Sequence, residues 1–436
     1  MQTLERRLGV TDAVVIGLGS MLGAGIFVVF APATAAAGSG SGLLIALAVA
    51  GLVAFCNATS SARLAARYPE SGGTYVYGRE RLGPFAGFLA GWGFVVGKTA
   101  SCAAMALTIG AYLWPGQARP VAVTAVLALT AVNLRGVQKT ARVTRWLVAA
   151  TLAVLALVAL AGLFGGAFRP ARIGNSVGAD GGGVHPGDVD GIVPVGVLTA
   201  AGLLFFAFAG YARIATLGEE VREPERTIPR AVPIALGLVL LSYLGLAVVA
   251  LSVLGPARLA SSTAPLAEVV DAAGLPGLDW LVRAGATVAV TGVLLALVAG
   301  VGRTGLAMAR RRDLPGGLAA VHPTYRVPHR AELAVAAVVI LVVALGDVRD
   351  AIGFSSCTVL VYYAITNASA LTLPRESGRR LPGRTLAVLG LVGCLLLAVA
   401  LPIGSVLAGF AALAIGALGY AARRFVRHSG GADGSR

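Results

Sequence analysis

Long apolar stretches recur along almost the whole chain and constrain its fold more than any other feature. A helix needs about 20 mostly apolar residues to cross the hydrocarbon core of a bilayer. Such stretches make up most of the 436 residues, and the charged residues, 13% of the total, fall mainly between them. We therefore predict an all-α polytopic membrane protein with about twelve transmembrane helices. The expected spans are 12–37, 42–66, 84–113, 119–134, 143–165, 192–217, 231–254, 280–308, 332–346, 350–373, 384–402 and 405–427.

The distribution of basic residues predicts the orientation. With the N-terminus inside, six of the 35 Lys and Arg fall in expected outside segments, and three (Lys98, Arg213 and Arg303) fall within spans. The others lie inside, and such an excess is typical of cytoplasmic loops. We therefore expect a multi-pass protein of the cell membrane with both termini cytoplasmic. This distribution explains the net charge of +15 without a nucleic-acid partner.

Residues typical of enzymes and metal sites are sparse. The four Cys all fall within expected spans, and the four His fall in loops or in the tail. Neither set has the spacing of metal ligands, and no His-Glu-x-x-His or Gly-x-Ser-x-Gly motif occurs. We expect no enzyme activity, no metal and no cofactor. A channel is a distant alternative, because channels favour rings of charge or filter loops.

Two expected spans carry glycine near their middle. The first contains "GLGSMLGAGIF" (17–27), with Gly23-Ala24-Gly25 at its centre. The sixth contains "LLFFAFAGYARIATLGEE" (203–220), with Ala209-Gly210-Tyr211 inside an otherwise apolar run. Unpaired backbone groups cost several kcal/mol in hydrocarbon, so a break needs a partner for those groups. We interpret the breaks as a ligand site; the alternative is that the glycines are packing notches between helices.

The five-span interval between the two breaks predicts an internal repeat. Paired glycine-interrupted spans are typical of inverted-repeat transporters, and an odd number of spans per repeat inverts the second copy. We predict a first repeat over 12–165, a Gly-rich extracellular loop over 166–191 and a second repeat over 192–373. The other long outside segment, from Gly255 to Asp279, does not resemble a folded domain. The remaining segments are a two-helix hairpin over 384–427, a cytoplasmic N-terminus over 1–11 and a disordered cytoplasmic tail over 428–436.

Three separated motifs resemble those of the amino acid–polyamine–organocation permeases. They are "GLGSMLGAGIF", "FFAFAGY…GEEVREPERTIPRA" and "GRTGLAMARRRDLP", and the resemblance covers about residues 8–375. It implies a core built like that of the sodium-coupled leucine transporter, with five-plus-five inverted repeats and discontinuous helices 1 and 6. It also implies secondary active transport of amino acids by alternating access.

The resemblance assigns roles to residues around the breaks. The carboxylate of the substrate would meet N–H groups around Gly23, Ala24 and Gly25. Its ammonium would meet carbonyls near Met21, Phe206 and Ala209, beside Gly210, and Phe206 and Phe208 are candidates for an aromatic wall or gate. The expected cytoplasmic gate comprises Arg213, Glu219, Glu220 and Arg303.

Lys98 is an ionisable residue near the middle of the third span. It shares a helical stripe with Gly83, Gly87 and Gly91, and such a stripe indicates a close-packed face. A lysine at that depth should face the bundle interior or water. We interpret Lys98 as a proton-coupling or fixed-cation element; a structural ion pair or a snorkelling lysine is the alternative. The resemblance places the coupling position of related proton-coupled carriers at Thr151 instead.

The expected substrate is an amino acid with a neutral side chain. N–H groups at the first break suit a carboxylate, and Lys98 and Arg213 would repel extra positive charge. Transport is expected to be coupled to protons or to operate as exchange. A polyamine or organic-cation carrier and a sodium-coupled carrier are the alternatives, and the sequence does not predict the oligomeric state.

Overall fold

The computed structural model describes residues 8–68, 72–136, 141–178, 194–215, 221–374 and 383–429. Its α-helices are α1 Val10–Met21, α2 Ala24–Val28, α3 Phe30–Ala37, α4 Gly40–Arg67, α5 Thr74–Leu82, α6 Pro84–Leu113, α7 Ala118–Leu134, α8 Ala141–Phe164, α9 Pro194–Phe208, α10 Ala212–Ala215, α11 Pro224–Ser261, α12 Pro265–Ala272, α13 Asp279–Arg310, α14 His329–Leu345, α15 Val348–Leu371, α16 Gly383–Ala400 and α17 Ile403–Ser429. Short 3-10 turns connect several of them, including η3 Ala209–Tyr211.

Helices long and apolar enough to cross a membrane dominate the chain. Eleven such segments occur among the described residues. One segment joins α1 to α2, one joins the 3-10 turn at Pro115–Gln117 to α7, and one runs from α9 through η3 into α10. The expected span that is missing from these eleven is the ninth, 332–346, which corresponds to α14; this helix has 17 residues and lies against α6, α7 and α13. The all-α polytopic class is therefore confirmed, while the five-plus-five repeat stays a prediction.

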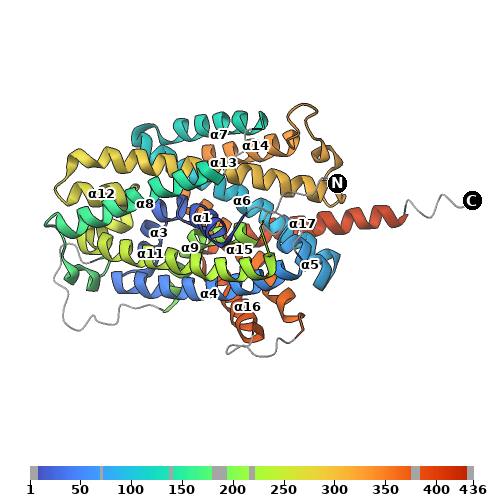
Figure 1. The fold of residues 1–436 in the computed structure, drawn as a ribbon, viewed down its shortest axis with the longest axis horizontal. Helices are drawn as coiled ribbons and strands as arrows, with labels where there is room; N and C mark the ends of the chain where they lie inside the picture. The colour runs from blue at the N-terminus through green and yellow to red at the C-terminus, as the bar shows by residue number, and fades with distance from the viewer. Residues whose placement is uncertain are drawn as a thin grey trace, which may run out of the picture.

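The long helices run side by side along one axis of the molecule (Figure 1). α6 lies inside the bundle, packed against α5, α7, α13, α14, α15 and α17. On the other side, α4 packs against α9, α11, α15 and α16. We call the end that holds α5, the turn after α13 and the last turns of α17 the basic end, because Arg79, Arg310, Arg311 and Arg423 lie there. α12 lies at the opposite end (Figure 1).

The segment from Gly255 to Asp279 is more ordered than the sequence indicates. α11 extends to Ser261 across a non-helical Gly255 (φ 75°, ψ 164°), a backbone conformation that favours glycine. α12 follows and buries Leu266, Val269 and Val270. A short amphipathic helix of eight residues is easily missed in a sequence, because its apolar face is only two turns long.

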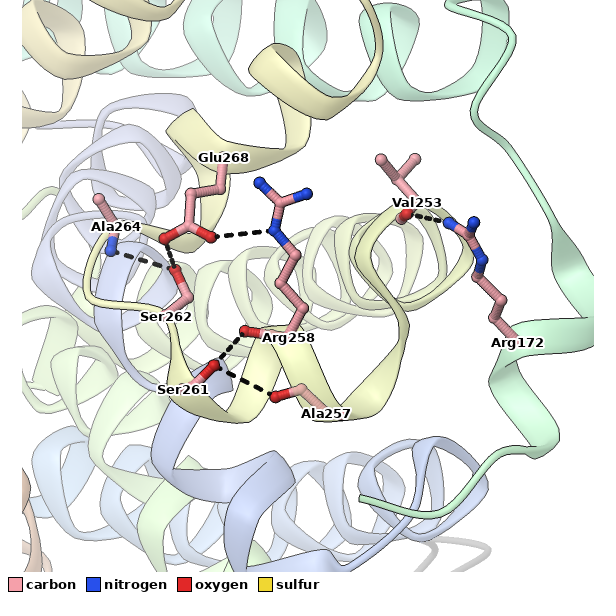
Figure 2. Close-up of polar contacts among 8 residues, drawn as sticks. All are labelled: Arg172, Val253, Ala257, Arg258, Ser261, Ser262, Ala264 and Glu268. Atoms are coloured by element: carbon pink, nitrogen blue, oxygen red, sulfur yellow. Dashed lines mark hydrogen bonds and ion pairs between the residues drawn. The ribbon is translucent and has the colours of Figure 1, made fainter. Parts of the chain in front are cut away.

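Polar contacts hold α12 against the end of α11 (Figure 2). The Glu268 carboxylate accepts a hydrogen bond from the Ser262 hydroxyl at 2.5 Å and lies 3.5 Å from Arg258 Nε. Ser262 Oγ in turn accepts from Ala264 N at 3.3 Å. Arg172, from the connection after α8, donates to the Val253 carbonyl just before the Gly255 kink. These contacts fix α12 at the opposite end of the bundle.

Candidate functional site

The first predicted interruption is present. α1 ends at Met21, and α2 begins at Ala24 after a non-helical Gly23 (φ −78°, ψ −123°). α2 and α3 form one nearly continuous rod, because Val29 is helical and its N–H donates to the Gly25 carbonyl. The first span therefore consists of two helical halves that meet at Leu22 and Gly23.

The second predicted interruption is also present. α9 ends at Phe208, and one 3-10 turn (η3) separates it from α10. The turn coincides with Ala209-Gly210-Tyr211, the residues at which the sequence predicts the break. Gly210 lies against the end of α1, since a Cβ there would collide with the Ser20 carbonyl. The two breaks thus contact each other directly.

Tyrosine hydroxyls from three other helices satisfy carbonyls at the breaks. Tyr243 of α11 donates to the carbonyls of Met21 (2.6 Å) and Ala207 (3.1 Å). Tyr363 of α15 donates to Ala209 O at 3.1 Å, and Tyr112 of α6 donates to Phe27 O at 2.8 Å. Sequence reasoning missed these tyrosines, because nothing in an apolar span marks a tyrosine as the partner of a distant break.

The glycines of the first break are also packing contacts. A Cβ on Gly25 would lie 2.5 Å from Cα of Ala207 in α9, and one on Gly23 would collide with Val293 in α13. Real Cβ atoms essentially never approach that closely. The packing interpretation of these glycines is therefore correct for Gly23 and Gly25, and it coexists with the broken backbone.

A cavity of about 200 Å³ adjoins the first break on its basic-end side. α1, α8 and α13 form most of its wall. The lining residues that bear on a ligand are Gly19, Ser20, Gly23, Thr144, Thr151 and Arg213. Three of the predicted site residues, Gly23, Thr151 and Arg213, therefore meet around one space, although they come from three different elements.

Other predicted site residues lie elsewhere. Met21, Phe206, Phe208 and Ala209 are buried in the core and do not line the cavity. The placement of the Ala24 side chain lies outside what the structure describes, and so do Glu219 and Glu220. Arg303 is exposed on α13, away from the cavity lining.

The cavity wall is mostly apolar and carries one positively charged side chain. Arg213 is the charged side chain among the described lining residues, and no Asp or Glu of the described chain lines the space. Thr151 is buried, and its hydroxyl donates to Leu147 O within α8 at 2.8 Å. The arrangement favours a small solute that carries a negative group and an apolar part.

The amino acid permease family model matches residues 8–415 of this chain. The chain belongs to this family. An uncharacterised transporter of Mycobacterium tuberculosis is 61% identical over 423 residues, which cover 97% of this permease and 92% of the relative. The branched-chain amino acid permease of Bacillus subtilis is 27% identical over 356 residues, which cover 75% of this chain and 72% of the relative. The methylthioribose transporter of the same organism is 27% identical over 355 residues, which cover 76% of this chain and 72% of the relative. The permease is thus a transporter of the amino acid–polyamine–organocation type and a multi-pass membrane protein.

Lys98 of the permease is buried inside the bundle. Its side chain is 8% exposed, and no hydrogen bond or ion pair forms at its ammonium within the described part of the chain. It shares a stripe of α6 with Gly91, which contacts Met308 of α13, and with Tyr112, which contacts α2. Lys98 does not line the cavity that holds Thr151, so the two predicted coupling positions are separate.

The third sequence motif forms a structural cluster at the basic end. Asp313, at the end of "GRTGLAMARRRD", accepts hydrogen bonds from the Tyr75 hydroxyl (2.6 Å) and from Arg79 Nη1 (3.2 Å), both on α5. Burial and the Asp313 carboxylate raise the pKa of Tyr75, so this phenol stays protonated and keeps donating. The motif therefore connects α5 to the turn after α13.

Proposed function

We propose that the permease is a secondary active transporter that moves amino acids with neutral side chains across the cytoplasmic membrane by alternating access. One observation carries the proposal: in a member of the amino acid permease family, two interrupted helices meet beside a small cavity that is lined by a positively charged side chain, Arg213. Interrupted spans whose half-helix ends point at the substrate are the usual site of such carriers.

The proposed binding mode uses the N-terminal end of the rod formed by α2 and α3. The substrate carboxylate accepts from N–H groups around Gly23, Ala24 and Gly25, where the helix dipole favours negative charge. Arg213 adds positive potential to the same cavity. A neutral side chain occupies the apolar part of the cavity, near Val148 and Val293. The volume of about 200 Å³ is small compared with drug-sized sites and suits a single amino acid.

The positive charge of Arg213 in the cavity wall weighs against polyamines and cationic amino acids as substrates. A second ammonium group would lie near the positive guanidinium of Arg213, which lines the cavity. The relative with a branched-chain amino acid in its name agrees with a neutral substrate. The methylthioribose relative is equally similar, so family membership alone does not choose the solute.

Coupling is proposed to involve protons, with Lys98 as the exchanging group, or to operate as exchange of substrates. The support is a buried lysine without a partner among the described residues. A sodium site is disfavoured, because the central part of α13, from Leu294 to Val301, offers no hydroxyl. The Lys98→Ala variant should lose the dependence of uptake on an imposed proton gradient; dependence at full amplitude would make Lys98 structural.

The test of function is uptake into proteoliposomes by purified permease. Thermal-shift screening of the twenty amino acids selects the solute, and counterflow of that solute distinguishes a carrier from a channel. Gly23→Ala should abolish counterflow, because its Cβ meets Val293. Gly300→Ala, a glycine of α13 with open space around it, is the matched control and should transport normally. Single-channel currents, or normal counterflow in Gly23→Ala, would contradict the proposal.

A further inference from the structure

A second and larger space lies on the side of the bundle, separate from the cavity at the break. Its volume is about 920 Å³, and its lining comes chiefly from α6, α14, α15 and α17. Small and β-branched residues dominate, among them Ala100, Ala334, Val335, Val338 and Ala408. Ala334, Val338 and Ala408 are exposed, so the space is open to the surroundings of the bundle. We call it the lateral groove.

Hydrocarbon fits the middle of the lateral groove. Thr99 donates its hydroxyl hydrogen to Val95 O at 2.7 Å, and Trp92 Nε1 donates to Ala412 O at 2.8 Å. Both donors are therefore satisfied within the protein, and Ser405 is the other hydroxyl in the lining. A solute with many polar groups would lose its hydration here without replacement. Acyl chains lose nothing on entering such a space.

The two ends of the lateral groove differ in charge. Arg423 of α17 lines the basic end, and one of its nitrogens donates to the Asp313 carbonyl at 3.0 Å. Arg310 and Arg311 are exposed on the neighbouring turn. The opposite end is lined by Asp347 and Asp350; Arg119 donates to Gly346 O there but does not line the groove.

The length of the lateral groove matches a membrane dimension. Its lining on the α14 side runs from Ala331 to Gly346. Fifteen residues of helix rise about 22 Å, whereas the hydrocarbon core is about 30 Å thick. The groove is therefore long enough to run along most of the apolar layer.

We propose that the lateral groove is a binding site for an anionic phospholipid. The acyl chains lie between α14 and α17, and the phosphate lies beside Arg423, whose guanidinium has four N–H donors beyond the one given to Asp313. Basic pockets between transmembrane helices recognise anionic headgroups in this way, and anionic lipids are enriched on the cytoplasmic side. The site is independent of the transported solute.

The experiment is native mass spectrometry of the purified, full-length permease, incubated with phosphatidylglycerol or with phosphatidylcholine of the same chains. We expect wild type to retain at least fivefold more phosphatidylglycerol than phosphatidylcholine. Ala408→Phe fills the groove from an exposed position and should lower retention of both lipids at least fivefold. Arg423→Gln should reduce phosphatidylglycerol to the level of phosphatidylcholine.

Two controls isolate the groove. Leu389→Phe lies on the exposed face of α16, outside the groove, and Arg384→Gln removes an exposed arginine at the start of that helix. Both should retain lipid as wild type does. If Ala408→Phe fails to fold, Ala334→Phe on the facing wall replaces it. Equal retention of the two lipids by wild type, or unchanged retention in the filled variant, overturns the proposal. The proposal is also overturned if wild type forms a dimer that Ala408→Phe dissociates, because a second copy of the permease would then occupy the lateral groove.

Discussion

The hydroxyl of Tyr243 offers the sharpest test of how the two broken helices are held. It lies 2.6 Å from Met21 O at the end of α1 and 3.1 Å from Ala207 O near the end of α9. One hydroxyl hydrogen thus faces two carbonyls that belong to the two interrupted spans. Tyr243→Phe removes this hydrogen and keeps the ring, which contacts Phe30 and Phe208.

The expected magnitude follows from the burial of these groups. Tyr243, Met21 and Ala207 are all buried, so water cannot replace the lost donor. A buried group left without its hydrogen bond costs about 1–3 kcal/mol. If the bond exists only in this arrangement of the helices, the same energy shifts the conformational equilibrium by about 5- to 150-fold.

Initial uptake rates over a range of substrate concentrations measure the effect. Because the bond joins the two breaks rather than touching the solute, we expect the maximal rate to change at least fivefold, with a smaller change in the half-saturating concentration. Thermal unfolding of Tyr243→Phe should shift downwards. Tyr420→Phe is the matched control, since Tyr420 stacks on Phe88 and its hydroxyl makes no hydrogen bond within the described chain. Rates within twofold of wild type and an unchanged unfolding temperature would refute the reasoning.

Three further substitutions test other contacts. Gly210→Ala should abolish uptake while leaving the protein in the membrane, because the added Cβ collides with the Ser20 carbonyl where the breaks meet. Uptake measures the first effect and the fluorescence of a fused reporter measures the second; normal uptake would show that the breaks separate easily. Arg213→Gln should raise uptake of lysine relative to leucine at least fivefold, because it removes the positive charge from the cavity wall. Competition assays measure this ratio, and an unchanged ratio would show that Arg213 does not discriminate between substrates. Asp313→Asn should lower the free energy of unfolding by about 1–3 kcal/mol, because Tyr75 and Arg79 lose a charged acceptor. Thermal unfolding measures the change, and a shift no larger than that of the control Asp350→Asn, at an exposed position, would contradict a stabilising role for Asp313.

The helices and their breaks were accessible from the sequence because both depend on local properties. The length of each apolar run fixes the span, and α6 begins and ends at the predicted residues 84 and 113. Gly23 marks where the backbone leaves the helix, and Gly210 lies in the 3-10 turn that follows α9. α1 begins at Val10, two residues before the predicted start, because the Asp12 carboxylate accepts from Gly9 N and caps the helix from its third position.

The partners of the breaks were not accessible, because they depend on tertiary packing. Val293 of α13 and Tyr243 of α11 reach the breaks from helices with no local signal for that role. The cavity likewise lies between α1, α8 and α13 rather than along the buried face of Phe206 and Phe208. A single sequence gives the faces of each helix but not which faces meet, so the wall of the site could not be assigned.

The tyrosine partners change how the ammonium of a substrate would be held. The family resemblance implies that carbonyls near Met21 and Ala209 are available to it, yet in this arrangement both accept hydrogen bonds from tyrosines. Each carbonyl has two lone pairs, so an ammonium that reaches it can share the oxygen with the phenol. Because Met21 and Ala209 do not line the cavity, such a contact requires that the space extend to the breaks.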